Sequence, residues 1–348
     1  MEILERSYIH KITSTCQEDL LFGRWITLDA ILKVFPKLIG AKISVERIGE
    51  SEESRDIYQM TAGTGPKKIL IWSQMHGNES TGTKALFDFF SFLNETDDRT
   101  TQQILSECTI KAIPILNPDG AQYYTRVNAN NVDLNRDAVD GIAVESQLLR
   151  STLESFNPDF CFNLHDQRTI FGVEGTTNPA TLSFLAPSEE ETREITDGRK
   201  RTMNIIVAMN SLLQQIIPNH IGRYTDKFYP TATGDNFQKL GFPTILIESG
   251  HYPNDYEREK VREFTFMSLL QGIYHIATAN NHENYDDYFT IPNNQENFRD
   301  LLYEYPDKPD EAFQFLEILD NNKVVFTPEK VYEDPSGLLF HEKIVIKS

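Results

Sequence analysis

Short apolar runs alternate along the chain with stretches in which apolar residues return every three or four positions. The apolar runs have the length of buried strands, and they cover residues 68–72, 109–116, 159–164 and 243–247. The other stretches have the spacing of amphipathic helices, and they cover residues 85–93, 145–155, 199–217 and 258–279. This order predicts an α/β domain with a mixed, largely parallel sheet and helices on both faces.

Two parts of the chain do not follow this alternation. Residues 1–40 have mostly helical spacing, and residues 42–49 and 55–61 flank a polar turn, which predicts a β-hairpin. Residues 166–198 are rich in turn-forming residues, so we expect them to form an irregular cover over a site.

The composition changes near residue 282. From there to the end the chain has 15 acidic and 6 basic residues, a net charge of −9 in a fifth of the length. This shift predicts a catalytic domain at 1–281, including the helical segment 1–40, and a small acidic α+β domain at 282–348. Within the small domain we expect a helix near 311–319 and strands near Val324 and Ile344.

The overall charge and the cysteine content narrow the choice of partners and compartment. The net charge is −19, which argues against nucleic acid or an anionic membrane as partner. Residues 1–14 lack the apolar core of a secretion signal, and no run reaches the roughly 18 apolar residues of a membrane span. Cys16, Cys108 and Cys161 are widely spaced, which predicts buried thiols and a cytoplasmic location. The oligomeric state is left open.

Polar side chains follow the ends of the four predicted strands. They are His76, Asn117, His165 and Glu248. In open α/β sheets, ligands bind at the carboxyl ends of the strands, so we expect these groups to lie near one site.

A histidine and a glutamate lie in the segment that follows the first predicted strand and precedes a predicted helix. His76 and Glu79 are three residues apart, and imidazole nitrogen and carboxylate oxygen both bind Zn²⁺ at about 2.0–2.2 Å. His165 is a plausible third ligand, although a lone histidine at a strand end is more often a core residue. Glu248 closes a fully apolar run, so its carboxylate either enters a cavity or needs a partner. Beside a zinc-bound water it could act as a general base.

A polar loop follows the turn from the second of these strands. It runs from Arg126 to Arg136 and contains Asp133 and Asn135. An arginine can clamp a carboxylate or stabilise an oxyanion, but the loop could equally be a solvated surface segment.

Taken together, the motifs resemble the zinc carboxypeptidase family. The resemblance rests on their order and spacing: His76-x-x-Glu79, Asn117-Pro-Asp-Gly120, Arg126-x-Asn-Ala-x-x-Val-Asp-Leu-Asn-Arg136, His165 and Glu248. It implies a family domain at about 42–279. The Arg126–Arg136 loop is similar to that of bacterial members that trim murein peptides. The sequence His76-Gly-Asn-Glu79 is similar to that of aspartoacylase-like deacylases.

The resemblance implies a role for each matching residue. His76, Glu79 and His165 would hold one zinc per chain, and Asp133 would orient a histidine ligand from behind. Glu248 would be the general base and Arg126 would stabilise the oxyanion. The substrate-binding residues would be Asn135 and Arg136, which bind the terminal carboxylate, and Tyr229, which covers the substrate, with Tyr224 and Tyr252 as rivals for that last role.

Three positions depart from the family pattern. Asn78 stands where digestive members have an arginine, Asp166-Gln167 follows His165 where a small hydroxyl residue is usual, and Asp137 follows Arg136. These departures affect the expected preference of the enzyme for the side chain of the cleaved residue, and not the metal chemistry. The remaining histidines are interpreted as surface or structural residues, with His251 the least secure because it lies three residues after Glu248.

We therefore predict a zinc-dependent hydrolase that removes the C-terminal amino acid of a peptide. A murein-peptide amidase or an N-acyl amino acid deacylase is the alternative enzyme, and its substrate would also carry a free carboxylate. A catalytically silent domain that binds peptide carboxylates is the alternative outside the enzymes. The small domain at 282–348 could in addition recruit a protein partner.

Overall fold

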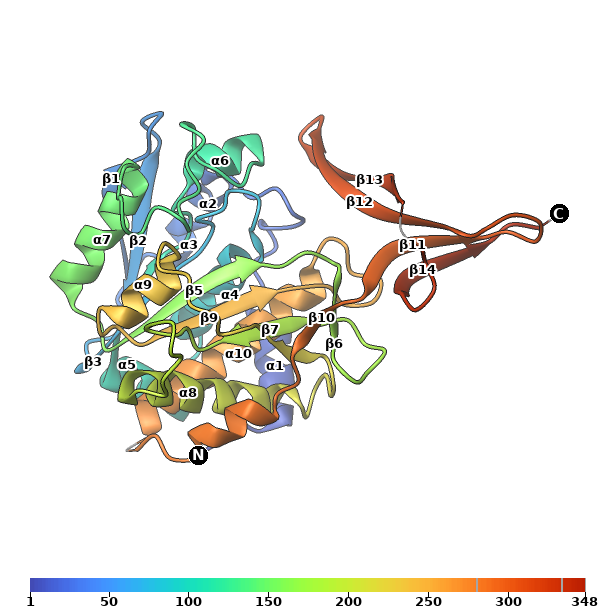
Figure 1. Ribbon diagram of the computed structural model, residues 1–348. Helices are drawn as coiled ribbons and strands as arrows, with labels where there is room; N and C mark the ends of the chain where they lie inside the picture. Colours follow the sequence, from blue (N-terminus) through green and yellow to red (C-terminus); the bar gives the residue numbers. More distant parts are fainter. Residues whose placement is uncertain (280, 333, 348) are drawn as a thin grey trace.

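The computed structural model describes residues 1–279, 281–332 and 334–347. Its body is built around an eight-stranded sheet, and a second, four-stranded sheet near the C-terminus projects from this body (Figure 1). No helix within the described residues is both long and apolar enough to cross a membrane.

The central sheet is mixed, with its parallel strands in the middle. Its strands, in spatial order, are β1 (Ile43–Glu50), β2 (Asp56–Ala62), β4 (Cys108–Ile113), β3 (Lys67–Trp72), β5 (Phe160–Asp166), β9 (Thr244–Ser249), β7 (Leu182–Leu185) and β8 (Ile221–Arg223). The four strands from β4 to β9 run parallel, whereas β1, β2 and β7 join through antiparallel pairs. The prediction of a mixed, largely parallel sheet is confirmed.

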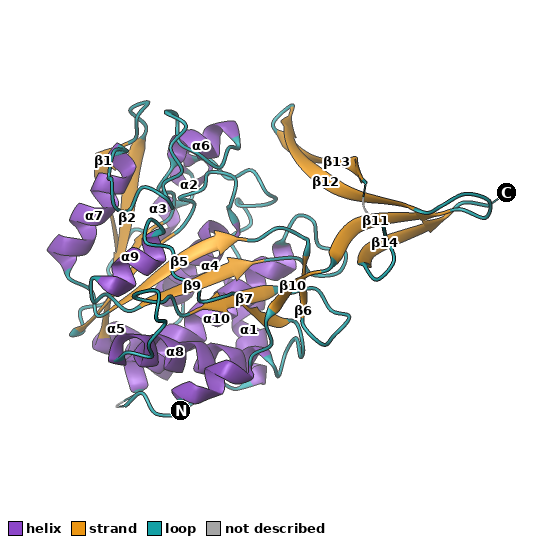
Figure 2. Ribbon diagram, viewed as in Figure 1, coloured by secondary structure: helices purple, strands orange, loops and turns teal. Residues whose placement is uncertain are grey.

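Alternation along the central strands directs residues to two separate cores. On β3, Ile69 and Ile71 enter one apolar cluster, and Leu70 and Trp72 enter the other. The first cluster is covered by α1 (Arg6–Cys16), α2 (Leu28–Leu32), α3 (Phe35–Leu38), α4 (Thr81–Glu95), α5 (Arg99–Glu107), α8 (Asp197–Leu213) and α10 (Glu259–Thr278). The second is covered by α7 (Val144–Phe156) and α9 (Thr233–Lys239) (Figure 2). Helices on both faces were predicted.

The main strands and helices lie where the apolar pattern predicted them, and the short elements were missed. The three cysteines are buried and free, as expected. Residues 166–198 were expected to be irregular, but they contain β6 (Phe171–Val173) and β7, which pairs with β9 in the central sheet. Strands of three or four residues are too short to show a period, which explains why they were missed.

The prediction of a helix at 311–319 is wrong. This segment is β12 (Glu311–Asp320), and it pairs antiparallel with β13 (Lys323–Val331) along its whole length. The two-residue turn between them consists of Asn321 and Asn322, with φ values of 47° and 63°. Positive φ at both positions is the geometry of a tight hairpin turn, and asparagine tolerates it, so the turn selects the strand pairing over a helix.

The remaining strands complete a C-terminal sheet rather than an α+β unit. This sheet has the order β13, β12, β11 (Phe298–Glu304) and β14 (Leu339–Val345). Between residue 282 and the end, the helical structure within the described residues is one short 3₁₀ helix, η1 (Tyr285–Thr290).

The residues just after 282 pack on the body. Tyr288 and Ile291 are buried in the first apolar cluster, and β10 (Asn294–Glu296) pairs with β6. The division of the chain at 281/282 therefore stays a prediction, and this packing favours a boundary after β10.

Candidate metal centre

The first two candidate metal ligands, His76 and Glu79, lie in a tight loop between β3 and α4. Gln74 begins this loop with a φ of 50°. A Cβ on Gly77 would lie 1.9 Å from the backbone carbon of Gly120, at α6 (Pro118–Tyr123), so only glycine fits there. Asn117 caps α6 by accepting a hydrogen bond from Gly120, and its amide donates to the carbonyl of Met75. Asn117 thus fixes the loop instead of entering the site.

The third metal-ligating residue and the predicted base lie on neighbouring strands. His165 on β5 and Glu248 on β9 are opposite each other in the parallel register. The residues next to them along the strands, Leu164 and Ile247, belong to the first apolar cluster. Because side chains alternate, His165 and Glu248 both extend from the other face, at the carboxyl edge of the sheet.

Three buried side chains converge on one point. The Nδ1 atoms of His76 and His165 lie 2.8 Å from the two carboxylate oxygens of Glu79, and 3.1 Å from each other. Ligands of one tetrahedral zinc lie about 3.3–3.6 Å apart at bond lengths of about 2.0–2.2 Å. The donor set and the spacing therefore fit a zinc ion after an expansion of a few tenths of an ångström.

The charges of this group stabilise an ionised carboxylate. Burial favours the protonated form of Glu79, but the two histidines outweigh it and hold the pKa of Glu79 well below its usual value. Burial lowers the pKa of His165, which favours the neutral imidazole that binds metals.

Asp133 and Arg126 flank the group on one side. Asp133 accepts a hydrogen bond from His76 Nε2 at 3.0 Å, which leaves Nδ1 of His76 for the metal. The other oxygen of Asp133 accepts from Arg126 Nε at 3.0 Å, and Arg126 also lies 3.3 Å from Glu79. The guanidinium of Arg126 is 45% exposed, so it can still reach a substrate.

Glu248 has an environment that favours the protonated form. Burial, together with the negative charges of Glu79 and Asp166, raises the pKa of Glu248 well above its usual value. A carboxyl group that holds a proton more tightly than usual is suited to accepting and returning one.

The predicted carboxylate-binding residues lie farther out. Asn135 accepts a hydrogen bond from the backbone of Thr233 through its side-chain oxygen. Arg136 is exposed, and it donates to the carbonyl of Asn135. Tyr229 is 46% exposed, and its backbone N–H donates to Asp235.

The rival tyrosines differ in their relation to the centre. Burial first, and then the charges of Glu248 and Glu79, raise the pKa of Tyr224, so these two carboxylates lie near enough to act on its hydroxyl. Tyr252 instead packs against the rings of His220 and Phe264.

A buried ionic cluster beside the centre was missed by sequence reasoning. The guanidinium of Arg258 forms an ion pair with Asp166 at 3.2 Å, and Arg24 donates to Glu317 on β12 at 3.0 Å. Tyr124 donates to the same glutamate. The cluster joins residues from both ends of the chain, so no local spacing could have indicated it.

The departures from the family pattern have structural explanations. Asp137 is buried and accepts the backbone N–H groups of Ile142 and Ala143, so it shapes the turn after Arg136. Asp166 accepts from Thr81 at the start of α4. The ring of His251 packs at a tilt against the ring of His341, with ring centres 4.0 Å apart, which supports its structural interpretation.

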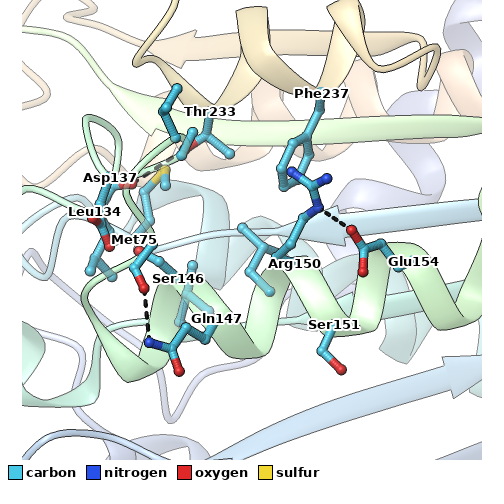
Figure 3. Close-up of a pocket in the computed structure, with 15 residues that line it drawn as sticks. Met75, Leu134, Asp137, Ser146, Gln147, Arg150, Ser151, Glu154, Thr233 and Phe237 are labelled. Carbon is cyan, nitrogen blue, oxygen red and sulfur yellow. Dashed lines mark hydrogen bonds and ion pairs between the residues drawn. The ribbon is translucent and has the colours of Figure 1, made fainter.

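Two cavities lie near these residues. One of about 820 Å³ reaches Glu79 and Arg126, and its far wall comes from β12 and β13. The other, of about 280 Å³, lies between the 134–141 loop and α7 (Figure 3). Its floor is apolar, with Met75, Leu134 and Phe237, and Arg150 pairs with Glu154 at its rim. Since Glu79 and Arg126 line the larger cavity and not the smaller one, we place the chemistry at the larger cavity.

Two histidines and a glutamate at the carboxyl edge of an α/β sheet, beside a second glutamate, are the components of a zinc hydrolase site. The family profile described as "Zinc carboxypeptidase" matches residues 29–240, and the chain belongs to this family. The match contains the residues from His76 to Tyr229 discussed above, and it ends before Glu248.

Relatives with known names match shorter stretches. Carboxypeptidase SOL1 of Arabidopsis thaliana is 40% identical over 186 residues, which cover 48% of this chain and 38% of that protein. Carboxypeptidase E of Caenorhabditis elegans is 30% identical over 169 residues, 41% of this chain and 36% of that protein. Probable carboxypeptidase 2 of Trichophyton verrucosum is 26% identical over 102 residues, 29% of this chain and 20% of that protein. The chain thus spans well under half of each relative.

Solved structures share the fold. The metallo-carboxypeptidase of Burkholderia cenocepacia superposes with a TM-score of 0.59 at 16% identity, over 72% of this chain and 69% of that one. Carboxypeptidase A of Helicoverpa armigera gives a TM-score of 0.58 at 14% identity, over 79% and 80%. At these identities the similarity establishes the fold alone.

Proposed function

We propose that this protein is a zinc-dependent carboxypeptidase that hydrolyses the last peptide bond of a peptide with a free C-terminus. The observation that carries the proposal is the convergence of His76, Glu79 and His165, with Glu248 opposite His165 on the next strand. A catalytically silent domain would be expected to lack a ligand or the base, and this chain has retained both.

His76, Glu79 and His165 would hold the zinc ion, and Asp133 would keep His76 in the tautomer that binds it. When bound, zinc supplies a Lewis acid for the scissile carbonyl and the attacking water.

Glu248 would move the proton. Its carboxylate accepts a proton from the attacking water and then donates it to the nitrogen of the leaving amino acid, so the amine departs neutral. The raised pKa of Glu248 supports this double role, because the protonated form must persist until the C–N bond breaks.

Arg126 would stabilise the oxyanion that develops on the carbonyl oxygen. Its guanidinium is half-exposed and is held by Asp133, so it is oriented before the substrate arrives. Asn135 and Arg136 would bind the terminal carboxylate, and a tyrosine, Tyr229 or Tyr224, would cover it.

The alternative enzyme is an amidase or deacylase acting on murein peptides or N-acyl amino acids. It would use the same metal centre and base, so the difference lies in the substrate. The partial exposure of Arg136 and its bond to a backbone carbonyl leave this alternative open.

The test is a mass-spectrometric assay of the purified, zinc-loaded protein against peptides, murein peptides and N-acyl amino acids. We expect the wild type to release single C-terminal amino acids from free-acid peptides, and the Glu248→Gln variant to release them about 10²–10⁴-fold more slowly. Cleavage of acyl amino acids or murein fragments alone would replace the carboxypeptidase by the deacylase or amidase. No turnover of any substrate would contradict a catalytic role.

A further inference from the structure

The larger cavity is bounded by two parts of the chain that are far apart in sequence. On one side it is lined by Asn78, Glu79 and Arg126 at the metal centre. On the other side it is lined by residues 314–317 of β12 and 329–332 on and after β13. The C-terminal hairpin therefore forms a wall of the cavity that Glu79 and Arg126 of the metal centre also line.

The hairpin is held against the body by a buried contact near its tip. Glu317 accepts hydrogen bonds from Arg24 and from the hydroxyl of Tyr124. The side chain of Arg24 is only 3% exposed. A buried cation needs its counter-charge, so this contact fixes the end of β12 in place.

A second set of contacts holds the middle of β12. Asp300 on β11 accepts from the backbone of Phe315 at 2.7 Å, from the amide of Gln314 and from the hydroxyl of Tyr256. Phe315 also packs on the ring of Tyr256. Because β12 is fixed both at Phe315 and at Glu317, the wall is a built part of the site.

The residues that line the cavity are mostly polar or charged. They include Asn78, Gln167 and Gln314, whose side-chain amides can both donate and accept hydrogen bonds. A short stretch of peptide, which has N–H and C=O groups of its own, can form hydrogen bonds with side chains of this kind.

If the terminal carboxylate binds to Asn135 and Arg136, as proposed, the cavity takes the acyl side of the scissile bond. Asn135, Arg136 and Glu248 are absent from the described residues that line it. A substrate with its carboxylate on Asn135 and Arg136, and its scissile carbonyl at the metal centre, extends its N-terminal part into the cavity. A volume of about 820 Å³ is within the range of about 300–1,000 Å³ of pockets for small-molecule ligands.

We propose that the β12–β13 hairpin limits this enzyme to short substrates, a peptide or acyl amino acid whose acyl part fits the cavity, and that Glu317 is the positioning residue that keeps the wall closed. This inference rests on the proposed peptidase function. It assigns a role in substrate selection to the C-terminal sheet, and it excludes the C-termini of folded proteins as substrates.

The test is a series of peptides from dipeptide to decapeptide with the same C-terminal residue, assayed with the full-length, zinc-loaded protein. We expect kcat/KM to fall by about tenfold or more, equivalent to about 1.4 kcal/mol, once the acyl part exceeds the cavity. Equal kcat/KM values for the shortest and longest peptides would overturn the inference and leave the proposed function intact.

Two variants test the wall itself. Glu317→Gln should raise the ratio of kcat/KM for the longest peptide to kcat/KM for the shortest peptide by about tenfold. Its zinc content should be unchanged, and the backbone amides of β12 should exchange hydrogen faster. Glu263→Gln is the matched control, because it also removes an ion pair of a glutamate, with Lys260 on α10, and neither residue lines the cavity. The same rise in both variants, or faster exchange in Glu317→Gln without a change in the ratio, would contradict the assignment.

A protein that cleaves no peptide would contradict the proposed function. The length limit would then be measured by calorimetric binding of the same series. Affinity that falls as the peptides become longer supports a length limit set by the β12–β13 hairpin. Equal affinity for all lengths refutes that limit.

Discussion

Glu248 lies directly opposite His165 in the parallel ladder between β9 and β5. Neighbouring strands lie about 4.8 Å apart, and paired residues direct their side chains to the same face. The distance between the proposed base and a proposed metal ligand is therefore fixed by main-chain hydrogen bonds. His76 and Glu79, in contrast, depend on the packing of a loop.

Zinc content tests the ligand assignment. We expect about one zinc per chain in the wild type, and a loss of bound metal in His76→Ala and His165→Ala. Asp133→Asn should weaken zinc binding by about 10- to 100-fold, because it removes the charge that orients His76. Elemental analysis and competition with a chelator measure both effects. Equal zinc in all four proteins would refute the assignment.

Substitution of the base should separate catalysis from metal binding. Glu248→Gln is nearly isosteric but cannot accept a proton, so we expect a loss of about 10²–10⁴-fold in kcat with zinc retained. Removal of a buried carboxyl group whose pKa is raised should not destabilise the fold at neutral pH. Kinetics, zinc content and melting temperature are measured on the same preparation. A variant that keeps its activity would show that another residue is the base.

Arg136 distinguishes a carboxypeptidase from an amidase. Arg136→Ala should slow hydrolysis of free-acid peptides by an amount that corresponds to about 2 kcal/mol, the lower end for a charge-assisted contact, because this arginine is exposed. It should have little effect on C-terminally amidated peptides, which lack the carboxylate.

Arg126→Ala is the comparison for this experiment. It should slow both kinds of peptide alike, because an oxyanion forms in either reaction. If Arg136→Ala impairs both kinds equally, Arg136 does not bind the terminal carboxylate.

The close approach of Gly77 to Gly120 predicts that position 77 is unusually sensitive to substitution. Gly77→Ala places a Cβ 1.9 Å from a backbone carbon, so the His76 loop must move. We expect a loss of about 1–3 kcal/mol in stability and weaker zinc binding. Gly40→Ala is the control, since the atoms nearest to its Cβ would be 3.9 Å and 4.0 Å away. Thermal unfolding and zinc titration of both variants measure these effects. Similar stability and zinc affinity in the two variants would contradict the special sensitivity of position 77.

His275 should make the free energy of unfolding depend on pH. It is 3% exposed and bonds to Asn204, and burial lowers its pKa from 6.5 to about 4. The unfolded chain binds the proton more tightly, so the stability due to this residue is complete above pH 6.5 and is lost as the pH falls towards 4. The loss is about 3 kcal/mol at about 1.4 kcal/mol per pKa unit.

Denaturant unfolding of the wild type and of His275→Gln at pH 7 and pH 4 measures this effect. The variant should lose less stability than the wild type between the two pH values. The same loss in both proteins would exclude His275 as a source of the acid sensitivity.

Much of the candidate site could be predicted because parallel strands end at one edge of a sheet. His165 and Glu248 follow apolar runs, so their convergence with His76 required only the order of elements. The roles of these residues came from the family resemblance, since a histidine or glutamate at a strand end is compatible with several sites.

The C-terminal wall could not be predicted in this way. The spacing of Phe313, Leu316 and Leu319 fits a helix as well as a strand, and the asparagine turn that decides between them lies after the segment. The contact of Arg24 with Glu317 has no local signal, because it depends on where two separately folded segments meet.

The separation of 293 residues between Arg24 and Glu317 has a consequence for the order of folding. Contacts between remote parts of a chain carry the largest loop-closure entropy, and they form late. The proposed metal ligands and base lie within residues 76–248, whereas the hairpin that closes the cavity docks on the N-terminal segment. Late docking would therefore set the proposed length limit after the proposed catalytic groups are in place, and a chain with an undocked hairpin would accept longer substrates.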